Sequence, residues 1–217
     1  LLDEHGDVIN YYWWSKDLLI KGIGGFYERN IANAMRPTYP PVTSYIFWLS
    51  AYLHEGLWKL IWLANISLKW FPSNLVFWFE SEKGWYFTNK IPAILADLAI
   101  GYVIYEFVRS KINEKKALLA SFLFLFIPPF WYNSSLWGQT DSIYALPLML
   151  SLIKLSENKK VISALWLSLA FLVKPTVAYV LPVYLIFWFK NIGLRKFLYS
   201  LVVCSLTIFL LYFPFHS

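Results

Sequence analysis

Apolar residues in this chain gather in blocks of roughly 15–20, and as a helix such a block crosses about 30 Å of hydrocarbon. The blocks are apolar on all sides, as a helix facing lipid can be, whereas a surface helix of a soluble domain keeps a polar face. Only 15% of the residues are charged, against about 25% in ordinary soluble domains. We therefore expect an all-α polytopic membrane protein.

Region 91–217 divides into six expected transmembrane spans. They are Ile91–Val108, Ala117–Trp131, Asp141–Leu155, Val161–Lys174, Pro175–Phe189 and Phe197–Phe213. The turns after the first, third and fifth spans contain ten basic residues, and the opposite turns contain one. Short loops rich in Lys and Arg stay on the cytoplasmic side of a membrane. The sequence therefore predicts a six-span bundle in 91–217 and an external loop formed by 1–90.

The segment Thr43–Leu63 is long enough for a further span, but it contains His54, Glu55 and Lys59. Each of these side chains costs free energy at the centre of a bilayer. We expect an amphipathic helix that lies in the plane of the membrane interface, with its Trp side chains at headgroup level. The alternative interpretation is a seventh span.

Lys174 lies in a turn between two short expected spans. Val161–Phe189 must cross twice with about 14–15 residues each, or roughly 21–23 Å at 1.5 Å per residue. The turn Lys174-Pro175-Thr176 then lies below the outer membrane surface. A Lys at that depth is stable where it lines a protein cavity, so we expect an anionic partner there. The alternative is that Lys174 extends to the outer interface.

Composition also bounds the partners. The three histidines lie far apart, and the single Cys204 sits in an apolar run, so we expect no metal site and no cofactor. A divalent metal is left open, although no pattern supports one. Most basic residues lie between spans, so the net charge of +6 does not indicate nucleic acid. The chain begins at Leu1 without Met and ends at Ser217, and we interpret it as part of a longer protein whose first transmembrane helix and C-terminal part are missing.

Five motifs follow one another along the chain, and the expected topology places all but one on the outer face. They are His5-Gly6-Asp7 followed by Trp14, Arg36-Pro37-Thr38-Tyr39-Pro40-Pro41, Ala96-Asp97-Leu98, Leu136-Trp137-Gly138-Gln139-Thr140-Asp141 and Leu172-Val173-Lys174-Pro175-Thr176. In this order they resemble the GT-C class of membrane glycosyltransferases. The first loop is similar to that of dolichyl-phosphate-glucose glucosyltransferases, and the Trp-Gly-Gln-Thr-Asp segment is similar to prokaryotic mannosyltransferases of the class. The resemblance covers nearly the whole chain and implies a GT-C-like helical bundle with a long external first loop carrying interfacial helices.

The resemblance also implies roles for particular residues. Asp7 is the expected general base, which takes the proton of the acceptor hydroxyl, and Asp3 is its rival. Lys174 is expected to bind the donor phosphate as a point charge. Substrate is contacted by aromatic and hydrogen-bonding side chains of both external segments, namely Tyr39, Trp137, Gln139 and Asp141.

Structural roles remain open for several of these residues. Asp7 and Asp141 are also placed where an Asp caps a helix. Asp97 is expected to be a buried acid that pairs with Lys174 or accepts a hydrogen bond from Tyr102 or a Trp.

The resemblance implies an inverting enzyme that moves a hexose, mannose or glucose, from a polyprenyl- or dolichyl-phosphate carrier to a glycan, lipid or protein acceptor. Its active site is expected on the extracytoplasmic side, of the plasma membrane in a prokaryote or of the endoplasmic reticulum in a eukaryote. A transporter or flippase for a lipid-linked or sugar substrate is the alternative, and a non-catalytic assembly subunit is a third. The long aromatic external loop favours the enzyme, because a transporter has no general need for one.

Overall fold

The structure is a computed structural model, and it describes residues 6–189 and 193–216. Within these residues the chain forms helices and turns without any strand, which confirms the all-α prediction. The region predicted to lie outside, 1–90, contains α1 (Gly6–Lys21), α2 (Pro41–Ser67), α3 (Ser73–Glu80) and the start of α4 (Glu82–Lys111). The remaining helices are α5 (Glu114–Phe126), α6 (Pro128–Trp131), α7 (Asp141–Ser156), α8 (Lys160–Val173), α9 (Leu181–Phe189) and α10 (Leu194–Tyr212). Shorter helical segments are a π-helix at Tyr132–Trp137 and 3-10 turns at Phe26–Glu28, Pro175–Val180 and Phe213–Phe215.

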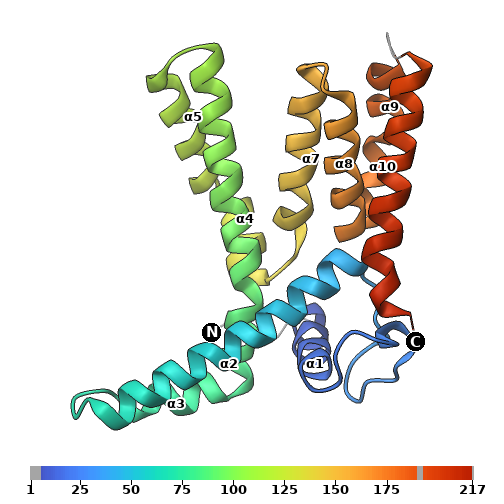
Figure 1. Cartoon of the computed structure of the whole chain (residues 1–217). Helices are drawn as coiled ribbons and strands as arrows, with labels where there is room; N and C mark the ends of the chain where they lie inside the picture. The colour runs from blue at the N-terminus through green and yellow to red at the C-terminus, as the bar shows by residue number, and fades with distance from the viewer. Residues whose placement is uncertain (1–5, 190–192, 217) are drawn as a thin grey trace.

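The long apolar helices stand side by side, and α1 and α2 lie across one end of them (Figure 1). In the described part of the chain, α4 and α10 are long and apolar enough to cross a membrane. The bent pair formed by α5 and the segment Pro128–Trp137 is a third candidate if it counts as one span. α8 and the segment Pro175–Phe189 are shorter apolar helices. The protein is therefore an all-α membrane protein, and the number of six crossings stays a prediction.

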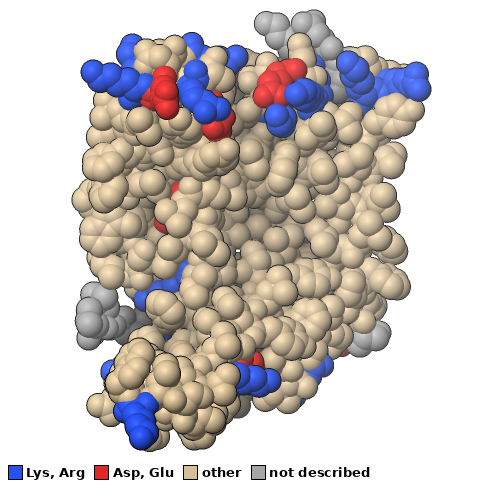
Figure 2. Space-filling model, turned by 60° about the vertical axis from the view of Figure 1, so that its left-hand side comes forward, with Lys and Arg blue, Asp and Glu red and all other residues tan. Residues whose placement is uncertain are grey.

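Charged side chains gather at the end of the bundle opposite α1 (Figure 2). A broad band with few charges separates them from a smaller charged group near α1–α3. The turns between α4 and α5 and between α7 and α8 lie at the strongly charged end (Figure 1). An uncharged band between two charged ends suits a helical bundle in a bilayer. The orientation predicted from the basic turns would place α1–α3 outside.

The helix expected in the membrane interface is α2. It begins at Pro41, which suits a first helical position because its missing N–H would have no helical partner. α2 crosses beneath the upright helices instead of standing among them (Figure 1). His54 is buried against α3 and α4, stacked on Phe79 and Trp85 with ring centroids 4.7 and 3.9 Å away. The His54 imidazole, which would be costly to bury in lipid, therefore faces protein. The location of α2 in the membrane interface stays a prediction.

Two aromatic clusters hold α1 in place beneath the bundle. One joins α1 to the end of the described chain through Tyr11, Trp14, Phe47 and Phe215, all buried. The Gly25 N–H also donates to the Phe215 carbonyl at 3.0 Å. The second cluster joins α1 to α2 and α4 and contains Val8, Tyr12, Ala51, Trp85 and Tyr86. The segment that contains α1 and α2 is thus packed against the helical bundle, and one face of α1 is buried there.

Candidate functional site

Asp7 lies in the first turn of α1, where the positive end of the helix dipole favours a carboxylate. Its side chain accepts a hydrogen bond from the amide of Gln139, with 2.7 Å between Nε2 and Oδ2. Gln139 belongs to the turn that precedes α7. The two external motifs that carry these residues, 132 positions apart, therefore meet in the folded chain.

Asp7, Tyr39 and Lys174 line one cavity of about 340 Å³. Its wall comes from α1, from the segment before α2, and from the turn between α8 and α9. The lining residues are Asp7, Asn10, Trp14, Met35, Thr38, Tyr39, Pro40, Lys174, Pro175 and Thr176. The structure thus brings together the expected base, the expected phosphate-binding cation and one expected substrate contact. We refer to this space as the outer cavity.

Lys174 is the residue at which α8 ends. Its backbone is extended, with φ −150° and ψ 123°, and Pro175 after it starts a new helical turn. On the neighbouring backbone, the Thr43 hydroxyl donates to the Val173 carbonyl at 2.7 Å. This bond ties the break after α8 to the beginning of α2. Lys174 is therefore presented from a backbone that both α2 and α8 hold.

The ammonium of Lys174 forms an ion pair with Asp141, with 2.5 Å between Nζ and Oδ1. The side chains are 22% and 38% exposed, so the pair is partly shielded from solvent. The other oxygen of Asp141 accepts a hydrogen bond from the Asn133 amide at 3.2 Å. The expected anionic neighbour of Lys174 is thus present, and in this structure it is a carboxylate of the protein.

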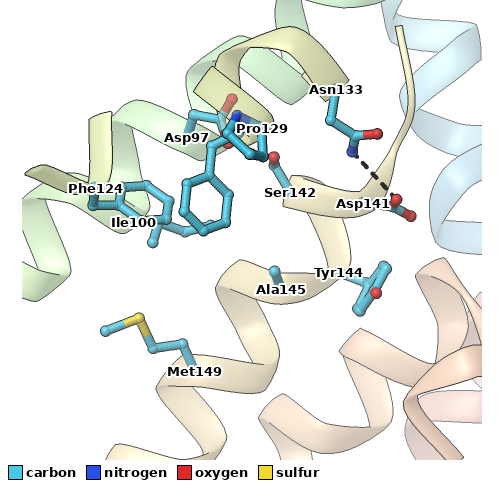
Figure 3. Close-up of a pocket in the computed structure, with 11 residues that line it drawn as sticks. Asp97, Ile100, Phe124, Pro129, Asn133, Asp141, Ser142, Tyr144, Ala145 and Met149 are labelled. Atoms are coloured by element: carbon cyan, nitrogen blue, oxygen red, sulfur yellow. Dashed lines mark hydrogen bonds between the residues drawn. The ribbon is translucent and has the colours of Figure 1, made fainter. Parts of the chain in front are cut away.

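Asp141 also lines a second cavity, of about 460 Å³, which lies between α4, α5, α6 and α7. Figure 3 shows Asn133 and Asp141 at one side of this space and Phe124, Ile100 and Met149 at the other. Tyr144 lines it as well, and the ring of Tyr144 lies 5.9 Å from the Lys174 ammonium. The Lys174–Asp141 pair therefore stands where the two cavities approach each other.

Asp97 has partners that the sequence did not indicate. Its two oxygens accept hydrogen bonds from the hydroxyls of Ser134 and Ser142. All three residues are buried. The expected pairing of Asp97 with Lys174 is wrong in this structure, because Lys174 pairs with Asp141. In the described structure Ser134 and Ser142 donate to Asp97 in place of the expected Tyr102, whose side chain is 65% exposed. Through these bonds the Asp97 carboxylate, which would otherwise be costly to bury, joins α4 to the π-helix and to α7.

Tyr39 reaches the outer cavity because α1 holds the segment before α2. The hydroxyls of Tyr11 and Tyr39 lie 2.9 Å apart. Asn10 accepts a hydrogen bond from the Met35 N–H at 2.8 Å, and Trp14 donates to the Met35 carbonyl at 2.8 Å. Burial, followed by the neighbouring Tyr39, raises the pKa of Tyr11 well above its ordinary value, so Tyr11 stays a neutral hydrogen-bonding group.

Other residues of the outer cavity, among them Asn10, Trp14, Met35 and Thr38, were given no substrate role from the motifs. A signal for two of them exists in the sequence. Asp7, Asn10 and Trp14 are spaced by three and four residues, which places them on one face of a helix. Interfacial helices were predicted within 1–90, but none was assigned to the residues of α1, so this periodicity was not used.

Trp137 and Gln139 belong to the second external motif but are absent from the described lining of the outer cavity. The Trp137 ring is 42% exposed and meets Tyr132 edge-on, with 5.9 Å between ring centroids. Gln139 is half-buried and directed at Asp7. Their expected contact with substrate stays a prediction. Asp3, the rival of Asp7, lies outside the described residues.

No group of three or more His, Cys, Asp or Glu side chains is arranged to hold a metal ion in segments 6–189 and 193–216. The absence of a metal site stays a prediction.

Comparison with known proteins adds one finding. Residues 83–216 match the family described as dolichyl-phosphate-mannose-protein mannosyltransferase, and no curated protein matches the chain. The matched region includes Asp97, Gln139, Asp141 and Lys174, and it begins after the segment that carries Asp7. It spans more than half of the 217 residues. The chain therefore belongs to the dolichyl-phosphate-mannose-protein mannosyltransferase family and is a membrane glycosyltransferase of the GT-C class.

Proposed function

We propose that this protein transfers a hexose from a polyprenyl- or dolichyl-phosphate carrier to an acceptor hydroxyl on the extracytoplasmic side of the membrane. The single observation that carries the proposal is that Asp7 and Lys174 line the same cavity. A carboxylate and an ammonium facing one space are the two groups such a transfer needs. Family membership favours mannose as the sugar, with glucose as the second candidate, and the acceptor class is a glycan, a lipid or a protein.

The chemistry follows from the two groups. The acceptor oxygen attacks the anomeric carbon while Asp7 takes the hydroxyl proton. The bond between the anomeric carbon and the phosphate oxygen breaks, and its electron pair stays on the phosphate. Lys174 stabilises the negative charge that develops there. Because a single displacement occurs from the side opposite the leaving group, the configuration at the anomeric carbon is inverted.

The Lys174 ammonium is paired with the Asp141 carboxylate in this structure. A donor phosphate must therefore compete with that carboxylate for the ammonium. The Asn133 amide already donates to the second oxygen of Asp141. When a phosphate binds the Lys174 ammonium, the Asp141 carboxylate keeps its hydrogen bond from Asn133 and is not left without a donor. A lysine suits this exchange, because its ammonium is a point charge with three donors that can turn between partners.

The sugar would occupy the outer cavity between the two charged groups. Tyr39 presents an aromatic ring and a hydroxyl at its wall, and Asp141 lies beside the phosphate-binding position. Trp137 is a further aromatic side chain that the sequence predicts at the sugar. The lipid chain of the donor stays in the bilayer, which is why the phosphate site is expected at the recessed turn and not on a soluble domain.

The test is a transfer assay with the full-length protein in detergent or vesicles. Donors are a short-chain polyprenyl-phosphate mannose and the matching glucose compound, each with an anomeric configuration known beforehand. The proposal expects release of polyprenyl phosphate and a glycoside of inverted configuration. A product of retained configuration would contradict the single displacement. Movement of intact donor across vesicles without any transfer would instead favour the flippase alternative.

A further inference from the structure

The hydrogen bond between Gln139 and Asp7 joins the two external motifs at the carboxylate proposed as the base. A carboxylate and an amide at 2.7 Å form a short, charge-assisted contact. Both residues are partly buried, so solvent competes with the bond less than it would on an open surface. The contact therefore constrains how the carboxylate is turned.

The turn that carries Gln139 is held from several sides. The π-helix ends at Gly138, whose φ of +81° is a left-handed conformation that glycine adopts without strain. The N–H groups of Gly138 and Gln139 both donate to the Asn133 carbonyl. Lys90 of α4 donates to the Leu136 carbonyl at 2.7 Å. The backbone next to Gln139 is thus fixed to α4.

Gly138 also lies close to the residue after Asp7. A Cβ at position 138 would come within 2.8 Å of the Val8 side chain and 3.0 Å of the Lys90 side chain. Only glycine therefore lets the turn approach α1 at this point. The close approach brings the Gln139 amide within reach of the carboxylate one residue before Val8.

The side from which Gln139 contacts Asp7 distinguishes its role from that of a residue that binds substrate. Asp7 lines the outer cavity, whereas Gln139 is not among the described residues of its wall. The amide thus meets the carboxylate from the side of the second external motif. It is neutral, so it orients Asp7 without pairing its charge with a cation.

We propose that Gln139 is a positioning residue that holds the Asp7 carboxylate in the orientation required to accept the acceptor proton. The inference rests on the proposed function, and it assigns Gln139 a role in place of the direct sugar contact expected from the sequence. A general base works only when its oxygen is within hydrogen-bond reach of the proton, and small misplacements of reacting groups are costly in rate.

Two substitutions test the proposal in the full-length protein. Gln139→Leu removes the donor at similar size, and Gln139→Glu keeps the shape but replaces the donor by a second acid. Both are expected to lower kcat by about 10–100-fold while the donor KM changes by less than about twofold. The acid limb of the kcat–pH profile is expected to move to higher pH, further for Gln139→Glu. A donated hydrogen bond favours an ionised carboxylate, and a neighbouring like charge disfavours it.

The pH profile is the measurement that a merely structural role would not move. Among the described residues, Tyr39 and Lys174 line the outer cavity with Asp7, and Tyr11 interacts electrostatically with Asp7; all three are the same in every variant. Ser135→Ala, in the same π-helix, serves as the matched control and is expected to keep the wild-type profile. Thermal unfolding in detergent shows whether each variant is folded.

The outcomes separate the two proposals. Wild-type protein that transfers no sugar from either donor overturns the proposed function and this inference with it. Active wild-type protein together with Gln139 variants whose acid limbs coincide with wild type overturns the inference alone. A loss confined to donor KM would return Gln139 to the role of a substrate ligand.

Discussion

The ammonium of Lys174 and the carboxylate of Asp7 line the same partly enclosed cavity. The neighbours of each group determine its charge balance and its orientation. Charges interact more strongly in a partly buried site than in bulk water. Lys174 is already neutralised by Asp141, and Asp7 is already bonded to Gln139. At the scale of single residues, the proposal therefore separates a base from a phosphate ligand, and substitutions at the two positions should affect different kinetic quantities.

Asp7→Asn is expected to lower kcat by about 10²–10⁴-fold, the usual contribution of a general base. The substitution keeps the size of the side chain but removes the basic oxygen. The measurement is sugar transfer from a short-chain polyprenyl-phosphate donor, with donor binding recorded separately and expected to persist. Asp3→Asn is the matched control and should keep most activity. If Asp3→Asn is inactive and Asp7→Asn is active, then Asp3 is the base.

Lys174→Ala is expected to lower kcat/KM for the donor by about 10²–10³-fold, as loss of a group that stabilises developing charge does. Lys174→Arg should recover part of the loss, because charge returns with a different shape. Lys160→Met is a suitable control, since Lys160 is a buried lysine at the start of α8 and donates to the Trp188 carbonyl at 3.0 Å. Equal losses in Lys174→Ala and Lys160→Met would argue against a phosphate role.

At the scale of elements, the contact of α2 with α3 and α4 helps to fix the position of α1, which carries Asp7. His54 of α2 is sandwiched between Phe79 and Trp85, and its Nδ1 lies 3.2 Å from the Thr88 hydroxyl. The Thr88 hydroxyl in turn donates to the Gly84 carbonyl. Val8 and Tyr12 pack in the same cluster as Trp85, so this contact also positions α1 and Asp7.

Low pH should destabilise the packing of α2 against α3 and α4 around His54. Burial lowers the pKa of His54 from 6.5 to about 4. The His54 imidazole therefore binds a proton at higher pH in the unfolded chain than in the folded protein. The free energy of unfolding is highest above about pH 6.5 and decreases as the pH falls toward 4, by at most about 3 kcal/mol. The unfolding temperature of wild type should therefore decline across this window more than that of His54→Phe, which keeps the stacking. Parallel declines in the two proteins would contradict the assignment.

Gly84→Ala is expected to destabilise the same packing of α2, α3 and α4 by about 1–3 kcal/mol, the usual cost of overpacking. A Cβ at this position would lie 2.0 Å from the Phe79 carbonyl oxygen, so the backbone between α3 and α4 must shift. Gly56→Ala in α2 is the matched control, because nothing lies within 4 Å of its added Cβ. That substitution should be neutral or stabilising by up to about 1 kcal/mol. Thermal unfolding in detergent compares the two, and similar midpoints would contradict the packing argument.

At the scale of the whole molecule, the two ends of the bundle differ in charge and in fold. One end carries short basic turns, and the other carries α1–α3 and the outer cavity (Figures 1 and 2). A lipid-linked donor made available outside the cell membrane or in a lumen requires the outer cavity to face that side. Membrane orientation is thus part of the functional proposal.

Ser73→Cys and Lys115→Cys, each in a Cys204→Ser background, test this orientation. Both positions are exposed, one in α3 and the other at the start of α5. An impermeant thiol reagent applied to intact cells should label position 73 and leave position 115 unlabelled until the membrane is opened. The reverse pattern would invert the topology and place the outer cavity inside.

Much of the helical layout could be predicted from the sequence. The expected spans Asp141–Leu155 and Val161–Lys174 coincide with α7 and α8 within one residue at each end. Lys174 was expected beside an anion, and it pairs with Asp141. The depth of its turn below the membrane surface stays a prediction. The buried helix α1 was not expected, since its aromatic residues were interpreted as a loop motif.

Sequence alone determined the elements and their chemistry, since a run of apolar residues or a Pro at a helix start acts locally. Only the tertiary structure decided which polar groups meet. Asp141 pairs with Lys174, 33 residues away; Asp97 takes its hydrogen bonds from two serines; and Gln139 reaches Asp7 across 132 residues. Such pairs depend on how α1, α4, α7 and α8 pack against one another. A hydrogen bond acts over about 3 Å, and periodicity along a chain carries no information about distances of that size between separate helices.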